Sequence, residues 1–300
     1  MSAEAFTSPL SNSDIPRTYL IGTGRVGHSL AWAMHQTNWP LEAIFGRNSP
    51  KDFPLPVQRM SHLPPIAERC LWLLCVPDDQ IMEVAQELAA HNSYWSKAVV
   101  AHMSGLHTAS ALDVLRAKGA SVMSFHPLQT FVAQAPAERF SGIYVVMEGD
   151  QIALALGGQL ARHLGAQPHQ ISSAAKPAYH LAASIASNFL VTLMGISREV
   201  LAKIGFSEPD ARVLMQALVD GTITNLRNLP AGEALTGPIV RGDVHTVAQH
   251  LVVLKSELSG LKPFYQLMAA ETTRLAVQSE RLSVEKAQFI LEQILSETTS

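Results

Sequence analysis

The sequence predicts an α/β protein in which a doubly wound parallel-sheet domain is followed by an all-helical C-terminal domain. Three observations support this prediction. Residues 18–30, TYLIGTGRVGHSL, have the pattern of a strand, a glycine-rich turn and the first turns of a helix. Short apolar runs then alternate with helical patterns, which is typical of a parallel sheet covered by helices. From about residue 172 the alternation stops and only helical patterns remain.

The first turn has the G-x-G-x-x-G spacing of a Rossmann dinucleotide-binding loop. Gly22 would allow a tight turn, Gly24 would let a pyrophosphate approach bare backbone, and Gly27 would let helix and strand pack closely. The phosphates would lie at the N-terminus of the new helix. The motif alone is weak evidence, but the strand before it and the helix after it favour a dinucleotide site over a structural turn. The expected contacts are Gly22, Thr23, Gly24, Arg25, Val26 and Gly27.

The end of the second strand indicates which dinucleotide is bound. The run LEAIF is followed by GRNSPK, residues 46–51, and no acidic residue stands there to bind a ribose 2′-hydroxyl. Arg47 instead offers a planar fork for a phosphate, with Asn48, Ser49 and Lys51 as further donors. The alternative is an exposed turn with ordinary surface charges. We expect NADP(H).

The next elements follow the same alternation. Residues 50–65 contain several prolines and are expected to be irregular. The continuous apolar run 70–76 is typical of a strand covered on both faces, and it ends at Val76-Pro77, a further expected cofactor contact. More strands are expected at 98–103, 121–125 and 142–148. Helices are expected through Ile81, Val84 and Leu88 and at about 109–118 and 152–165.

The remaining chain is predicted to be helical. Residues 1–15 are expected to be a disordered lead-in, 16–172 the NADP-binding domain, and 173–300 a helical domain for substrate binding and dimerisation. Residues 177–196 have no formally charged side chain over a length that could span a bilayer. Polar groups through the middle of this segment favour a buried helix of a soluble protein. Helices are expected at 175–203, 208–228, 244–256, 263–278 and 284–295.

Composition excludes some partners. The formal charge of −3 gives no basic footprint for nucleic acid. A charged fraction of 16% beside a hydrophobic fraction of 47% indicates apolar surface hidden in a subunit interface, and we expect a homodimer formed through the long apolar helix. Cys70 and Cys75 lie on one predicted strand, so buried thiols are expected rather than a disulfide. The first fifteen residues lack the features of a signal peptide, and a cytoplasmic enzyme that acts on a small molecule is expected.

Ligands of an open parallel sheet lie beyond the carboxyl ends of its strands. His126, held by Pro127 at such an end, stands where a general acid or base or a carbonyl polariser is needed. Its alternative is a structural histidine bonded to loop carbonyls. Ser104 could bind the substrate or the cofactor, or it could cap the next helix. His102 lies within a strand and is expected to be a core histidine with its hydrogen bonds satisfied.

The first helix of the C-terminal half has a polar stripe. Lys176, His180 and Ser187 fall on one face at helical spacing, and Ser184 and Asn188 flank it. Lys176 would donate a proton or bind an anion, and His180 and Asn188 would hydrogen-bond the substrate. The alternative is a polar seam between packed helices. Arg241 could bind a substrate carboxylate, but pairing with Asp243 is favoured slightly. No metal-ligand spacing stands out.

The motifs together resemble the 6-phosphogluconate-dehydrogenase-like superfamily of NADP(H) oxidoreductases. Within it, the chain is similar to bacterial Rossmann-like proteins whose C-terminal half is a domain of unknown function. His126-Pro127 and Ser104 resemble motifs of prephenate dehydrogenases that contact the substrate's ring hydroxyl. The matching stretches are LIGTGRVG, CVPDDQI, HMSGLHTASAL, SFHPLQTF, YHLAASIASNFLVTL and ALTGPIVRGD.

The resemblance also implies a type of reaction. Lys176 matches the lysine of the Lys-x-x-x-Asn pair that hydroxyacid dehydrogenases of the superfamily carry, while His180 stands at the asparagine position. We therefore expect an NADP(H)-dependent oxidoreductase for a small carbonyl, hydroxy or imine compound that could be anionic. The alternative is an NADP-binding sensor or scaffold without turnover.

Overall fold

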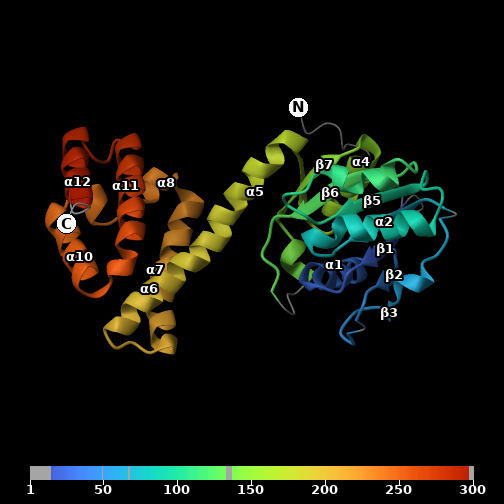
Figure 1. Cartoon of the computed structure of the whole chain (residues 1–300), viewed down its shortest axis with the longest axis horizontal. Helices are drawn as coiled ribbons and strands as arrows, with labels where there is room; N and C mark the ends of the chain where they lie inside the picture. Colours follow the sequence, from blue (N-terminus) through green and yellow to red (C-terminus); the bar gives the residue numbers. More distant parts are fainter. Residues whose placement is uncertain (1–14, 49, 67, 133–136, 297–300) are drawn as a thin grey trace. The chain divides into compact units, whose positions relative to one another are not determined.

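An eight-stranded sheet forms the centre of the N-terminal half, with the strand order β3-β2-β1-β4-β5-β6-β7-β8 (Figure 1). The computed structural model describes residues 15–48, 50–66, 68–132 and 137–296, so the expected lead-in lies outside the described residues except for Ile15. The chain divides into two compact units, Met1–Leu190 and Val191–Ser300. The second unit is helical, and the predicted fold class is confirmed.

The strands from β3 to β6 are parallel, and β7 joins β6 in antiparallel orientation. This pairing carries β6 through His126 and Pro127, which lie opposite Val146 and Val145. A short strand, β3, also forms in the proline-rich segment that was expected to be irregular. The strands are β1 (Arg17–Ile21), β2 (Leu41–Phe45), β3 (Val57–Gln58), β4 (Cys70–Leu74), β5 (Ala98–His102), β6 (Ser121–Pro127), β7 (Tyr144–Gly149) and β8 (Gln167–Gln170).

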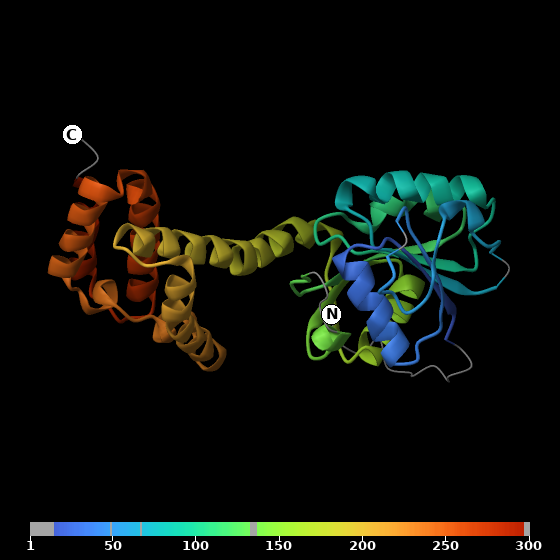
Figure 2. The same ribbon diagram turned by 90° about the horizontal axis from the view of Figure 1, so that it is seen from below.

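Helices cover both faces of this sheet (Figure 2). Helices α1 (Arg25–Gln36) and α4 (Gln151–His163) pack on one face, and α2 (Ile81–His91) and α3 (Asp113–Arg116) on the other. Alternate residues of each strand point to opposite faces. On β4, Leu71 and Leu73 therefore join the first core, and Trp72 joins the second. The free cysteines Cys70 and Cys75 are buried, as expected.

The second unit has its own core, made mainly by its last helices. Val247 and Leu251 pack there with Ile290, and all three are nearly inaccessible to solvent. Two short helices, α8 and α9, form in a turn-rich stretch where no helix was expected. The helices are α6 (Leu190–Lys203), α7 (Glu208–Asn228), α8 (Ala231–Ala234), α9 (Pro238–Arg241), α10 (Val244–Glu257), α11 (Lys262–Gln278) and α12 (Val284–Ser296).

The long apolar helix is not buried in the chain's own core, and the expectation that it would be is wrong. It runs from α5 (Lys176–Ser184) through a π-helix, η8 (Ile185–Phe189), into α6. Leu181 and Val191 on it are 58% and 72% exposed. By length and composition this helix could cross a membrane, with a mean hydropathy of 1.4 over its most apolar window. An apolar pattern alone does not distinguish a core helix from an interface helix.

Candidate functional site

A first cavity, of about 370 Å³, opens at the glycine-rich loop, beyond the carboxyl ends of β1 and β4. Gly22 has a positive φ of 111°, and a Cβ on it would overlap the carbonyl oxygen of Cys75. A Cβ on Gly27 would overlap the carbonyl oxygen of Gly22, whereas a Cβ on Gly24 would meet open space. Gly22 and Gly27 are therefore required by packing, and Gly24 leaves bare backbone at the cavity.

Helix α1 begins at this loop without a side-chain cap. Its N-cap is Gly24, no side chain accepts from its first amides, and its first turn contains no acidic residue. Helix N-termini carry unpaired N–H groups and a partial positive charge. The loop and the start of α1 thus offer donors to a phosphate, which fits the pyrophosphate of a dinucleotide.

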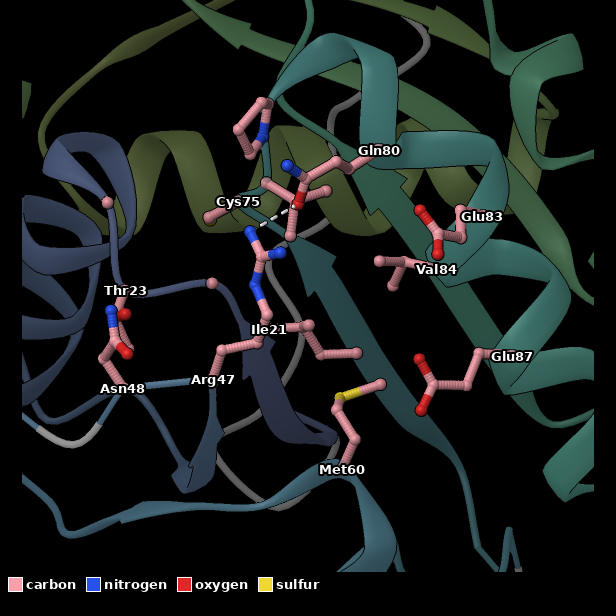
Figure 3. Close-up of a pocket in the computed structure, with 15 residues that line it drawn as sticks. Ile21, Thr23, Arg47, Asn48, Met60, Cys75, Gln80, Glu83, Val84 and Glu87 are labelled. Atoms are coloured by element: carbon pink, nitrogen blue, oxygen red, sulfur yellow. Dashed lines mark hydrogen bonds between the residues drawn. The ribbon is translucent and has the colours of Figure 1, made fainter.

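Arg47 lines the same cavity, and its side chain points toward Gln80 (Figure 3). Its Nη2 donates to Oε1 of Gln80 at 2.9 Å. Arg59, just after β3, donates from Nη1 to the backbone oxygen of Arg47 at 2.5 Å. Glu83 and Glu87 on α2 line the opposite wall. Among the described residues that line this cavity, Arg47 is therefore the one cationic side chain. Arg59 contacts the backbone of Arg47.

The structure brings together most of the predicted cofactor contacts. Gly22, Thr23 and Gly24 line the cavity with Arg47 and Asn48, and so do Val76 and Pro77. Ser49 lies outside the described residues. Five other predicted contacts, Arg25, Val26, Gly27, Lys51 and Ser104, are not among the residues that line it.

A second cavity, of about 570 Å³, lies beyond the end of β6 and along α5 and η8. His126, His180 and Asn188 all line it, so three predicted substrate residues come together. The π-helix supplies part of this wall, and π-type turns are frequent at functional sites. The described residues that line the cavity include no Lys, Arg, Asp or Glu. They are His126, Leu128, Gln129, Thr130, Tyr179, His180, Ala182, Ala183, Ser184, Ala186, Ser187 and Asn188.

Tyr179 holds the ring of His126. Its hydroxyl lies 2.6 Å from Nδ1 of His126, and the two rings meet edge to face. Burial, and to a smaller extent the charge of Lys176, lowers the pKa of His126 to about 4. Burial raises the pKa of Tyr179 to about 12. The phenol therefore keeps its proton near neutral pH, and His126 is a neutral imidazole.

Gly105 lies where the two imidazoles of the second cavity approach each other. A Cβ at Gly105 would lie 2.9 Å from Nδ1 of His180 and 3.0 Å from Nε2 of His126. Nδ1 of His180 is buried and has no hydrogen-bond partner among the described residues. A buried polar atom without a partner is costly in a folded protein. The short distances show that both rings pack against Gly105 and leave no room for a side chain there.

Lys176 is buried beneath the ends of β5 and β6 and is only 2% exposed. Its Nζ donates to the backbone oxygen of Ser104 at 3.0 Å and to the hydroxyl of Ser124. Burial lowers the pKa of Lys176 to about 8, while Glu148 and Asp78 act in the opposite direction. Lys176 is not among the described residues that line either cavity.

Ser104 organises the turn that follows β5. Its hydroxyl donates to Oδ2 of Asp78 at 2.6 Å and accepts from the backbone N–H groups of Leu106 and His107. Ser104 therefore closes a turn and does not cap the next helix, Ala109–Leu112, whose N-cap is Thr108. Ser104 lines neither cavity. Asp78 directly follows Pro77 of the first cavity, and Gly105, which follows Ser104, packs against the rings of His126 and His180.

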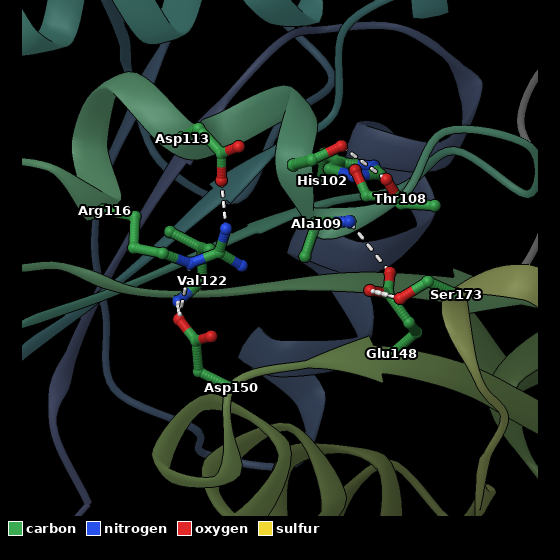
Figure 4. Close-up of polar contacts among 10 residues, drawn as sticks. His102, Thr108, Ala109, Asp113, Arg116, Val122, Glu148, Asp150 and Ser173 are labelled. Carbon is green, nitrogen blue, oxygen red and sulfur yellow. Dashed lines mark hydrogen bonds and ion pairs between the residues drawn. The ribbon is translucent and has the colours of Figure 1, made fainter.

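Further hydrogen bonds fix this edge of the sheet (Figure 4). Glu148 accepts from the backbone N–H of Ala109 at 2.8 Å and from the hydroxyl of Ser173 at 2.7 Å. His102 is fully buried, with Nδ1 accepting from the N–H of Ser104 and Nε2 lying 3.0 Å from the oxygen of Thr108. The expectation of a satisfied core histidine is thus confirmed.

Two family models together match most of the chain. The model of a Rossmann-like domain matches residues 6–127. The model of a domain of unknown function, DUF2520, matches residues 143–272. The chain joins a Rossmann-like domain to a DUF2520 domain. The sequence motifs had indicated this combination, which is thereby confirmed. His126 belongs to the Rossmann-like match, whereas Tyr179, His180 and Asn188 belong to the DUF2520 match, so both contribute to the second cavity.

Solved structures share this fold. Protein TM1727 from Thermotoga maritima is 26% identical, with a TM-score of 0.66 over 88% of this chain and 100% of that one. The putative NADP oxidoreductase BF3122 from Bacteroides fragilis is 21% identical, with a TM-score of 0.71 over 86% and 98%. Pyrroline carboxylate reductase from Plasmodium falciparum with NADP bound is 12% identical, with a TM-score of 0.56 over 92% and 99%. No curated protein matches the chain in sequence.

The loop before α10, in the DUF2520 domain, forms its own contacts. Nη2 of Arg241 lies 3.8 Å from Oδ2 of Asp243, which is the pairing that the sequence favoured. Asp243 also caps α10, because its carboxylate accepts from the N–H and the hydroxyl of Thr246. Within the described part of the chain, no group of three or more His, Cys, Asp or Glu side chains could hold a metal ion.

Proposed function

We propose that this protein is an NADP(H)-dependent oxidoreductase that transfers a hydride between the nicotinamide and a small carbonyl, hydroxy or imine compound. One observation carries the proposal. The first cavity has a dinucleotide-type loop, the second has two imidazoles, and both lie beyond the ends of strands of the same sheet. Between them, the Ser104–Asp78 hydrogen bond joins the loops that follow β5 and β4. In open α/β sheets, ligands bind at this edge.

The first cavity suits NADP(H). The loop at Gly24 and the start of α1 would bind the pyrophosphate. No acid ends β2, and Arg47, Asn48 and Arg59 would bind the 2′-phosphate. Two structures of the same fold support the cofactor, since one is named as an NADP oxidoreductase and the other contains NADP. When bound, the cofactor supplies or accepts the hydride.

The second cavity would hold the substrate. In the tautomer whose Nδ1 accepts from the hydroxyl of Tyr179, 2.6 Å away, the neutral imidazole of His126 would polarise the reacting group through Nε2–H. Asn188 and His180 would add hydrogen bonds. Lys176 was expected to be a proton donor, which stays a prediction. Its present contacts favour a positioning role, because its amine holds the turn of Ser104 and strand β6 at Ser124.

We also propose a soluble cytoplasmic homodimer in which a second copy covers the exposed apolar side chains of the long helix. Leu181, Phe189 and Val191 are exposed on it, and faces of this kind mark interfaces. Val191→Glu should then convert a dimer into a monomer in analytical ultracentrifugation. Val284→Glu, at an exposed position of α12, is the matched control. A monomeric wild type, or recovery only with membranes, would contradict this proposal.

The proposed activity is tested by binding first and turnover second. Purified protein is titrated with NADPH by cofactor fluorescence, and NADPH consumption is then followed with a panel of ketones, aldehydes and ketone–amine mixtures. Binding with turnover of at least one compound is expected. Absence of NADPH binding contradicts the proposal. Binding without any turnover favours the NADP-binding sensor.

A further inference from the structure

Helix α1 holds the loop between β2 and β3 through two of its side chains. This loop, residues 46–56, includes Arg47. Nε1 of Trp32 on α1 donates to the backbone oxygen of Asp52 in the loop at 2.7 Å. Nε2 of His28 lies 3.1 Å from the same oxygen and 3.2 Å from Oδ2 of Asp52. His28 and Trp32 are four residues apart, so both lie on one face of α1.

The hydrogen bonds of His28 show that this contact has a cost. In the tautomer that carries its proton on Nε2, the ring donates to Asp52, and a carbonyl oxygen can accept both this bond and that of Trp32. Nδ1 of His28 is then an acceptor, and it is buried without a partner among the described residues. A buried polar atom without a partner lowers the stability of the fold. A leucine would avoid that cost, so the stability of α1 does not explain a histidine at this position.

Apolar contacts hold the same part of the loop. The ring of Phe53 meets that of His28 edge to face, with the ring centroids 5.1 Å apart. Phe53, Leu55 and Trp32 are partly buried and pack against the first core. The side chain of Asp52, in contrast, is 58% exposed. Helix α1 therefore anchors the loop mainly through the backbone of Asp52.

The other end of the loop is held by β3 and the residue after it. The backbone N–H of Gly46 donates to the oxygen of Gln58 at 3.0 Å, and Nη1 of Arg59 donates to the backbone oxygen of Arg47 at 2.5 Å. Arg47 thus lies in a short segment that is fixed at both ends. A segment of this kind has fewer conformations to lose when it binds a ligand. Release of the Asp52 end would add that loss to the binding of a phosphate.

We infer that His28 and Trp32 are positioning residues for 2′-phosphate recognition, because they fix the loop that carries Arg47. This inference rests on the proposed function. NADH has no 2′-phosphate, and its pyrophosphate would bind at the glycine-rich loop and the start of α1. Loss of the anchor should therefore weaken the binding of NADPH and leave that of NADH nearly unchanged. A general loss of stability would weaken both.

Three variants of the full chain test the inference. Trp32→Phe removes the indole N–H and keeps an aromatic ring, and His28→Leu removes the Nε2 donor. Each should raise the Kd for NADPH, measured by cofactor fluorescence, by about threefold or more, because the loop must then be ordered on binding. The Kd for NADH should stay within about twofold, because NADH makes no contact that depends on this loop. His28→Gln offers an amide nitrogen in place of Nε2 and should restore most of the NADPH affinity.

The matched control is Trp39→Phe. Nε1 of Trp39 donates to Oγ1 of Thr18 at 2.7 Å, a bond of the same length as that of Trp32, but Trp39 precedes β2 whereas Asp52 follows it. This variant should leave the ratio of the two Kd values unchanged. An unchanged NADPH affinity in Trp32→Phe or His28→Leu, or an equal loss for NADPH and NADH, would overturn the inference. Circular dichroism establishes that each variant is folded.

Hydrogen exchange without cofactor separates this inference from the function on which it rests. Trp32→Phe should speed the exchange of the amides of residues 51–55 by about threefold or more, because the anchored loop opens more often. Trp39→Phe should not change it. If the wild type binds NADPH but this exchange is unchanged in Trp32→Phe, only the anchor is wrong. If the wild type does not bind NADPH, the proposed function is wrong and the inference falls with it.

Discussion

Replacement of Arg47 by alanine should change the cofactor preference of the protein and leave its fold intact. The guanidinium is exposed, lines the first cavity and has Gln80 as its side-chain partner, at 2.9 Å. A charge-assisted hydrogen bond to a phosphate is worth about 1.5–3 kcal/mol. Its loss corresponds to a Kd for NADPH that rises about ten- to a hundredfold or more.

The size of this effect also depends on the opposite wall. Glu83 and Glu87 line the same cavity and repel a phosphate. Without the Arg47 guanidinium, no cationic side chain among the described lining residues offsets this repulsion. We therefore expect Arg47→Ala near the upper end of that range. Arg59→Ala should have a smaller effect, because its guanidinium reaches the loop through the backbone oxygen of Arg47.

The assay titrates wild type and variants with NADPH and with NADH by cofactor fluorescence. Arg47→Ala should leave the Kd for NADH within about threefold, since NADH has no 2′-phosphate, and loss of one exposed side chain should shift stability by only about 0.5 kcal/mol. Arg274→Ala is the control, because its guanidinium is bonded to Glu271 at 2.8 Å in the second unit. An equal loss of NADPH and NADH binding would refute the role of Arg47 in 2′-phosphate recognition.

Three further predictions concern the second cavity and its support. In ¹⁵N-histidine NMR near neutral pH, His126 should be protonated at Nε2. Tyr179→Phe should produce a mixture of the two His126 tautomers, whereas the control variant Tyr265→Phe should not. An unchanged His126 signal in Tyr179→Phe contradicts the role of Tyr179. Because the pKa of His126 is lowered to about 4 from an ordinary value near 6.5, the unfolded chain binds the extra proton first and stability should fall as pH falls from about 6.5 to 4. His126→Phe should make the melting temperature less sensitive to pH in that window, and an identical slope contradicts the argument. Lys176→Met loses two charge-assisted hydrogen bonds, so chemical denaturation should show a free energy of unfolding lower by about 1.5–3 kcal/mol or more. The Kd for NADPH should stay within about threefold. Loss of cofactor binding in the folded variant would place this lysine in the dinucleotide site.

Local patterns predicted the parts of the site that depend on single elements. The strand–glycine–helix order located the first cavity, because the positive φ of Gly22 and the packing of Gly27 against Gly22 both arise within one βα turn. The strand-end rule and helical spacing brought His126, His180 and Asn188 to the same cavity. In each case the relevant geometry is set by a few neighbouring residues.

Other features depend on tertiary packing and could not be read from the sequence. Lys176 and His180 are four residues apart on one helix face, but periodicity does not give depth, and Lys176 lies beneath the strand ends while His180 reaches the cavity. Tyr179 precedes His180 on the helix and fell outside the polar stripe. Arg59 follows a short strand in a proline-rich segment whose pattern has no period. The apolar pattern of the long helix likewise carries no information about what covers it.

Deuterium transfer tests the central claim most directly. The protein is incubated with NADPH that carries deuterium at the transferable position of the nicotinamide, together with a panel of uncharged ketones, aldehydes and imines, and the products are analysed by mass spectrometry. The account predicts that at least one reduced product carries a single deuterium atom, and that His126→Ala lowers the amount of it. Tight binding of the labelled NADPH with no deuterium in any product would contradict the claim that this protein is an oxidoreductase.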